Sequence, residues 1–158
     1  MNTFKDFYSR QRQKFFSYLV RRSGDYHLAA DIMQESFTRL YEKYSEENFT
    51  PQLLYTIGRN LAHDELRRRN RNPSLSEQKD QPTIDPSHDL MVRDEYRRVM
   101  VAMRHLENDE RDLLSLAVSS DLSYRELAEM TGISVANVKV KIHRARKKLR
   151  SFLETGGT

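Results

Sequence analysis

The chain has 158 residues, 37% of them hydrophobic and 32% charged, with a formal net charge of +4. This balance allows one ordinary domain or two small helical ones, but no large core around an enclosed active-site pocket, so it favours a binding protein over an elaborate enzyme. Because the chain has no cysteine, it forms no disulfide, has no thiol nucleophile, and fits a reducing compartment.

The N-terminal stretch predicts no targeting or membrane segment. Residues 1–10 carry charge throughout and lack the apolar core of a signal peptide, and no run approaches the ~20 apolar residues that a bilayer helix needs. We therefore expect a cytoplasmic protein with no membrane insertion.

Residues 1–71 predict an N-terminal helical unit. Aromatic and aliphatic residues keep helical spacing over residues 4–19 and again over 29–44, on either side of a break at Gly24. A third helix begins after Thr50, which is able to cap it, and a proline follows at the first helical position. Three helices are thus expected in this unit.

The third helix carries a mixed polar face opposite its buried residues. Arginine, amide and hydroxyl groups in this arrangement suit single-stranded bases and phosphates. The arginines of residues 67–71 are equally explained as charges that neutralise the dipole at the helix end. The polar face and the short loop before it comprise Asn48, Phe49, Thr56, Arg59, Asn60, His63 and Arg67.

A linker separates this unit from a second one. Residues 72–88 contain three of the four prolines and few apolar side chains, which favours a flexible, partly extended segment. The C-terminal unit then spans 89–154, with a short tail at 155–158. The sequence predicts an all-α protein of two small helical domains joined by a flexible linker.

The C-terminal unit contains a helix-turn-helix pattern. Ser123 and Glu126 form a capping box that opens a short helix, Gly132 accepts the left-handed backbone of a turn, and Ser134 caps the next helix. Two helices joined in this way are typical of DNA-binding units.

The last helix, residues 135–153, has one narrow apolar stripe and an opposite basic face. Residues 134–158 hold seven basic side chains and one acidic one, which indicates contact with a polyanion rather than a merely solvated surface. Val140 on this face is unexplained by solvation, but it can contact a thymine methyl, while Arg144 suits guanine and Asn137 a phosphate or base edge. DNA binding is therefore favoured.

Several segments together resemble a known family. Residues 25–37 (DYHLAADIMQESF) and 54–69 (LYTIGRNLAHDELRRR) resemble the second conserved region of the extracytoplasmic-function (ECF) sigma factors of bacterial RNA polymerase. Residues 123–128 (SYRELA) and 138–149 (VKVKIHRARKKL) resemble their fourth region. The match covers nearly the whole chain outside the linker and the termini, in the order and spacing of the family.

This resemblance implies a transcription-initiation specificity factor with no catalytic chemistry and no cofactor. The second predicted helix would dock on the coiled coil of the polymerase largest subunit, through Asp31, Gln34, Glu35, Arg39 and Leu40. The third helix and its loop would capture the minus-ten promoter element, through Asn48, Phe49, Thr56, Arg59, Asn60, His63, Asp64 and Arg67. The last helix would read the minus-thirty-five element, through Ser134, Asn137, Lys139, Val140, Lys141, His143, Arg144 and Lys147. The implied partners are core RNA polymerase, including its beta flap, promoter DNA, and a separate anti-sigma factor.

The chain departs from the family pattern at three places. Leu53 stands where tryptophan is frequent, Gly58 where alanine is usual, and Leu106-Glu107 where a Leu-Pro pair usually opens the last domain. These departures remove no proposed contact, but they leave the ECF subgroup and the promoter sequence open.

Two other classes of function stay open on the residues alone. A stand-alone helix-turn-helix regulator would present the same last helix, but it leaves residues 1–71 unexplained. A metal enzyme would have to use Asp31, Glu35, His63 and Asp64, whose spacing lacks the Glu-x-x-His pairs of helical metal sites. We therefore expect no metal site.

Overall fold

The computed structural model describes residues 3–72 and 90–155, and within them the chain is α-helical apart from short connections. This confirms the predicted all-α class. The predicted linker, residues 72–88, lies outside the described residues apart from Asn72. The elements are α1 (Phe4–Ser23), α2 (Tyr26–Lys43), the 3-10 turn η1 (Glu46–Asn48), α3 (Pro51–Arg71), α5 (Leu90–Met103), α6 (Asn108–Ser119), α7 (Tyr124–Thr131) and α8 (Val135–Glu154).

The helices begin and end where local capping signals predict. The side chains of Thr50, Ser123 and Ser134 each accept a hydrogen bond from the backbone N–H three residues later, at 3.1 to 3.2 Å. Gly24 and Gly132 follow α1 and α7 with φ of 71° and 74°, the left-handed conformation that ends a helix. The predicted starts of α3, α7 and α8 and the turn between α7 and α8 are confirmed.

Helices α1, α2 and α3 pack around an aromatic core. Phe15 is 0% exposed and lies edge-on to Phe37 and Tyr55, with ring centroids 5.8 and 5.1 Å away. A Cβ atom at Gly58 would lie 2.4 Å from Cζ of Phe15. Only glycine therefore lets α3 approach α1 this closely.

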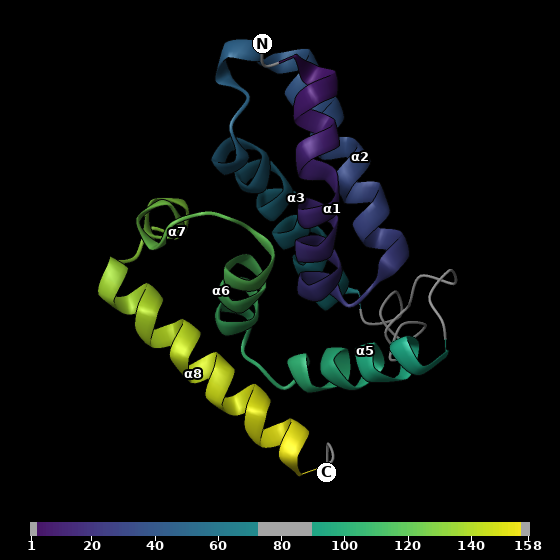
Figure 1. Ribbon diagram of the computed structural model, residues 1–158, viewed down its shortest axis with the longest axis vertical. Helices are drawn as coiled ribbons and strands as arrows, with labels where there is room; N and C mark the ends of the chain where they lie inside the picture. Colours follow the sequence, from purple (N-terminus) through teal and green to yellow (C-terminus); the bar gives the residue numbers. More distant parts are fainter. Residues whose placement is uncertain (1–2, 73–89, 156–158) are drawn as a thin grey trace.

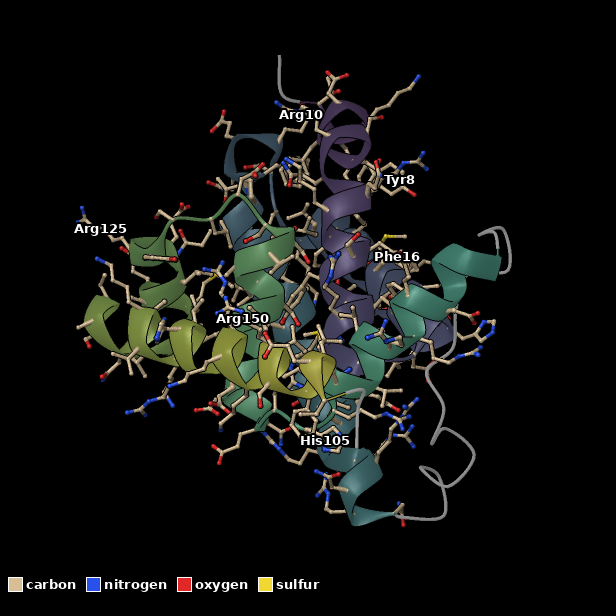
Figure 2. The ribbon with its side chains drawn as sticks, turned by 60° about the horizontal axis from the view of Figure 1, so that its bottom comes forward. Tyr8, Arg10, Phe16, His105, Arg125 and Arg150 are labelled. Atoms are coloured by element: carbon tan, nitrogen blue, oxygen red, sulfur yellow. The ribbon has the colours of Figure 1, made fainter. Side chains whose placement is uncertain are left out.

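Helix α8 spans the C-terminal unit and packs against α5, α6 and α7. Its predicted apolar stripe is confirmed, because Val138, Ile142 and Ala145 are at most 1% exposed. Near the end of α8, Phe152 stacks on His105, with ring centroids 4.1 Å apart. His105 is labelled in Figure 2. This contact joins the far end of α8 to the turn after α5.

The two predicted units are in contact. Helix α6 lies between α8 and the N-terminal helices, and it packs against both α8 and α1 (Figure 1). Helix α7 also touches α3. Besides leucines, α6 buries polar side chains, among them Asp112, Ser115 and Ser119. One helix thus belongs to the core of the second unit and to the contact between the units.

Candidate nucleic-acid interface

The face of α8 opposite its apolar stripe is open to solvent. Val140 is 43% exposed, and the neighbouring predicted contact residues are also exposed. They are Ser134, Asn137, Lys139, His143, Arg144 and Lys147. Helix α8 follows a capped short helix and a tight turn. In helix-turn-helix proteins, the recognition helix that enters the major groove follows the same arrangement.

One predicted member of this set is corrected by the structure. The amino group of Lys141 pairs with the carboxylate of Asp109 at the start of α6. Lys148 likewise pairs with Glu110, at 2.8 Å. Both lysines therefore hold α8 on α6, and Lys141 does not belong to the outward face.

The predicted minus-ten residues on α3 divide into two groups. Asn60, Asp64 and Arg67 are exposed, as is Asn48 in the preceding turn. The Thr56 hydroxyl donates a hydrogen bond within its own helix, to the Gln52 carbonyl at 2.7 Å. Arg59 and His63 instead turn toward α6, which covers part of the predicted surface.

Two predicted contact residues lie in the core. Phe49, expected in the minus-ten loop, is 4% exposed and packs against the rings of Phe4 and Phe7. Leu40, expected to touch polymerase, is 0% exposed. Both side chains are apolar and fill the bundle, so neither reaches a partner in this structure.

The other predicted polymerase residues share one exposed surface of α2. Asp31, Gln34, Glu35 and Arg39 are exposed, and Arg39 Nε donates to Glu35 Oε1 at 2.8 Å, one helical turn away. Beside Gln34 lies an open groove of about 610 Å³ between α1 and α2. Its lining is mostly apolar and aromatic, namely Phe4, Tyr8, Ala30, Met33, Phe37 and Tyr41.

Asp112 on α6 gathers basic side chains from the first unit. Arg59 Nε donates to its Oδ2 at 2.6 Å, and the Tyr18 hydroxyl donates to its Oδ1 at 2.6 Å. Arg22 Nε lies 3.4 Å from Oδ1, and His63 Nε2 lies 3.8 Å from Oδ2, beyond hydrogen-bond distance. The Asp112 side chain is only 2% exposed. A single carboxylate therefore ties α1 and α3 to α6.

The charges at this contact set the protonation of the buried groups. Burial by itself raises the pKa of Asp112, but the nearby imidazole and the two guanidinium groups outweigh burial and lower this pKa to about 2. Burial, and next the charge of Asp112, raise the pKa of the Tyr18 hydroxyl. At neutral pH the carboxylate is ionised and the tyrosine remains a donor.

Positive charge exceeds negative charge here. Arg111 on α6 is also drawn into the contact, where its Nε donates to the Arg21 carbonyl at 2.8 Å. Burial, followed by the nearby charges of Arg22 and Arg104, lowers the pKa of Arg111 to about 10. The contact around Asp112 thus holds more basic than acidic side chains, and this one carboxylate balances only part of their charge.

Sequence reasoning did not identify Asp112, although a signal was present. Asp112, Ser115 and Ser119 step by three and four residues along a helix that is otherwise rich in leucine. Such a stripe indicates a second, polar packing face. Its partners Arg59 and Tyr18 are 53 and 94 positions away, however, and helical spacing does not predict them.

The described residues contain neither a metal-binding cluster nor a membrane-spanning helix. Asp31, Glu35, His63 and Asp64 form no metal-binding group there, nor do other His, Asp or Glu residues of the described ranges. None of the described helices is long and apolar enough to cross a bilayer.

Two family descriptions match separate parts of the chain. Residues 7–72 match "Sigma-70 region 2", and residues 96–149 match "Sigma-70, region 4". The first range contains α3, with its partly covered polar face, and the second contains α7 and α8.

Relatives of known description match nearly the full chain. The chain is 26% identical over 163 residues to the ECF RNA polymerase sigma factor SigM of Bacillus subtilis. The aligned region covers 98% of this chain and 97% of that protein. It is 27% identical over 144 residues to the ECF RNA polymerase sigma factor EcfG of Rhodopseudomonas palustris. That aligned region covers 89% of this chain and 80% of that protein.

Two solved structures share the fold. The sigma factor RpoE, in a co-crystal structure with the anti-sigma factor NepR from Bartonella quintana, matches with a TM-score of 0.73 and 21% identity, over 95% of this chain and 98% of that chain. CnrH, in complex with the cytosolic domain of CnrY, matches with a TM-score of 0.71 and 21% identity, over 96% of this chain and 88% of that chain.

Proposed function

Since the chain belongs to the ECF sigma factors and is a sigma factor of RNA polymerase, we propose that it binds core polymerase through α2 and reads promoters with α3 and α8. In this assignment α3 recognises the minus-ten element and α8 recognises the minus-thirty-five element. The main support for this proposal is the exposed face of α8.

The assignment of α8 rests on the chemistry of that face. Arg144 and His143 lie beside the exposed Val140 on a helix whose other side is fully packed. A guanidinium can address guanine bidentately, and an apolar side chain can touch a thymine methyl. Lys139 and Lys147 flank them and suit phosphates, which position a helix without reading sequence.

The assignment of α3 rests on exposed amide, carboxylate and guanidinium groups along one helix face. Asn60, Asp64 and Arg67 are available in the structure as it stands. Mixed polar groups of this kind suit an unpaired base and its backbone. Arg59 and His63 would complete the surface if α6 moved away.

The assignment of α2 rests on a polar surface beside an apolar groove. Asp31 and Gln34 are exposed, and Tyr41, which lines the groove, is 66% exposed. A helical partner that presents both charged and apolar side chains, such as a coiled coil, fits this combination.

An anti-sigma factor is a further proposed partner. Both solved relatives described above are complexes with a second protein, which is named as an anti-sigma factor for RpoE. By analogy, we propose that a separate protein of this class holds the present chain inactive.

Run-off transcription tests the proposal. Core RNA polymerase would be incubated with fragments of the source genome, with and without the protein, and new transcript ends would be mapped. We expect new starts downstream of one shared two-part motif. If the polymerase neither binds the protein nor starts at new sites, while the protein alone shifts duplex DNA, a stand-alone helix-turn-helix regulator is the correct function.

A further inference from the structure

Two ion pairs join the start of α6 to α8, and they differ in their exposure to solvent. Lys141 pairs with Asp109, and Nζ of Lys148 lies 2.8 Å from Oε1 of Glu110. The two lysines are two helical turns apart, so they lie on the same side of α8. The Glu110 side chain is only 7% exposed, whereas the side chains of Asp109 and Lys141 are 49% and 33% exposed. The pair formed by Asp109 is therefore the one that solvent and a ligand can reach.

The position of Asp109 is fixed by the way in which α6 begins. The Glu110 side chain accepts a hydrogen bond from the backbone N–H of Glu107 at 3.2 Å and so closes a capping box. Oδ1 of Asp109 accepts from the backbone N–H of Glu110 at 2.9 Å, and Oδ2 accepts from Lys141. The hydrogen bond from Lys141 lowers the pKa of Asp109. At neutral pH an ionised, well-placed carboxylate thus holds the lysine.

Lys141 borders the face of α8 that is assigned to DNA. At 100° per residue it lies about 40° around the helix from Asn137 and about 60° from Arg144, and both of these residues are exposed. Positively charged side chains of a recognition helix commonly contact phosphates, and lysine has a long, flexible stem. Lys141 is thus able to reach a DNA backbone, but its pair with Asp109 directs it toward α6.

Asp109 and a DNA phosphate offer the same kind of partner to this amino group. Lysine binds carboxylate and phosphate oxygens by charge-assisted hydrogen bonds. The carboxylate is already in place, because the backbone of α6 holds its other oxygen. A phosphate would have to displace it, so the two anions compete for one lysine.

We propose that Asp109 withholds Lys141 from the DNA backbone and so limits the affinity of α8 for duplex DNA of any sequence. This inference rests on the proposed role of α8 in binding DNA. A phosphate contact strengthens binding to all sequences alike. Without it, binding by α8 depends more on contacts to base edges, such as those proposed for Arg144.

The test uses the full-length chain and two neutralising changes. Asp109→Asn removes the negative charge but keeps an oxygen that accepts the hydrogen bond from the α6 backbone. Lys141→Gln removes the positive charge of the partner. The double variant has the same net charge as the wild type, so a comparison of these two proteins is free of any effect of overall charge.

Binding to a fluorescein-labelled pool of short duplex DNA of random sequence is followed by anisotropy over a range of salt concentrations. We expect Asp109→Asn to bind more tightly than the wild type. The slope of log affinity against log salt should become steeper by about 0.9, the value for one additional phosphate contact. A fourfold rise in salt should then weaken this variant about 3.5-fold more than the wild type. The double variant should match the wild type in both affinity and slope.

A purely structural role for the ion pair predicts the opposite direction. If the pair only held α8 on α6, Asp109→Asn would loosen the recognition helix and weaken binding. Circular dichroism and thermal unfolding check that each variant keeps its helices. Asp109→Ala, which introduces the residue with the highest helix propensity, repeats the test if the asparagine variant loses helicity.

The outcomes separate this inference from the function on which it rests. An unchanged slope in Asp109→Asn, or a gain in affinity that persists in the double variant, overturns the withholding of Lys141. A double variant that binds more weakly than the wild type also overturns it, because Lys141 would then already contact DNA. Lys147→Gln tests the role of α8 itself and should make the slope shallower by about 0.9. Unchanged binding by Lys147→Gln overturns the assignment of α8, and the inference with it.

Discussion

Replacing Gly58 with alanine should destabilise the N-terminal unit. The added Cβ would lie 2.4 and 2.6 Å from Cζ and Cε1 of Phe15, well inside van der Waals contact. The ring cannot move aside easily, because it is 0% exposed and is held edge-on by Phe37 and Tyr55. Overpacking of a core costs about 1–3 kcal/mol, and alanine returns about 1 kcal/mol of helix propensity relative to glycine. At so short a distance we expect a net loss of about 1–2 kcal/mol.

Urea unfolding followed by circular dichroism measures this loss. A double-mutant cycle with Phe15→Leu identifies its cause, because a smaller side chain makes room for the new methyl group. The double variant should lose less stability than the sum of the two single variants. Asn70→Ala, at an exposed position of the same helix, is the control for helix propensity. If Gly58→Ala is as stable as the wild type, or if the two changes are additive, the close approach of α1 and α3 does not limit this core.

Other expected outcomes concern the charges and the exposed faces. The pKa of Asp112 lies below its ordinary value, at about 2, so its contribution to stability is present above about pH 4 and is lost as the pH falls toward 2. Urea unfolding between pH 6 and 2 should accordingly show a smaller acid-induced loss for Asp112→Asn than for the wild type. Arg144→Ala should cost about 1–3 kcal/mol of discrimination at one minus-thirty-five position, whereas Arg150→Ala, a change of equal charge on the same helix, should weaken all promoter variants alike in transcription assays. Replacing Asp31 and Gln34 with alanine should impair assembly with core polymerase on a gel-filtration column and leave helicity intact, and unimpaired assembly would remove this face of α2 from the binding surface.

Helix boundaries were predictable because their signals are local. The caps of α3 and α8, Thr50 and Ser134, bond to backbone groups three residues away, so a short stretch of sequence contains the whole interaction. The outward face of α8 was predictable for a similar reason, since helical periodicity alone places Val140 opposite Val138 and Ile142.

Long-range packing was not predictable in this way. Phe49 and Leu40 were expected at binding surfaces, but both are core residues, because the spacing of an apolar residue does not say which neighbouring helix covers it. The orientation of Lys141 depends on Asp109, 32 positions earlier. The role of Asp112 depends on groups from two other helices, and only the folded chain brings them together.

The order of synthesis adds a consequence to the contact between α3 and α6. Arg59 leaves the ribosome before Asp112, which follows 53 positions later. At about 5–20 residues per second, with N-terminal domains folding first, the face of α3 stays uncovered for roughly 3–10 s on every new chain. A nascent chain therefore exposes Arg59 before α6 can cover it, and the speed of translation through the intervening codons sets the shortest duration of that exposure.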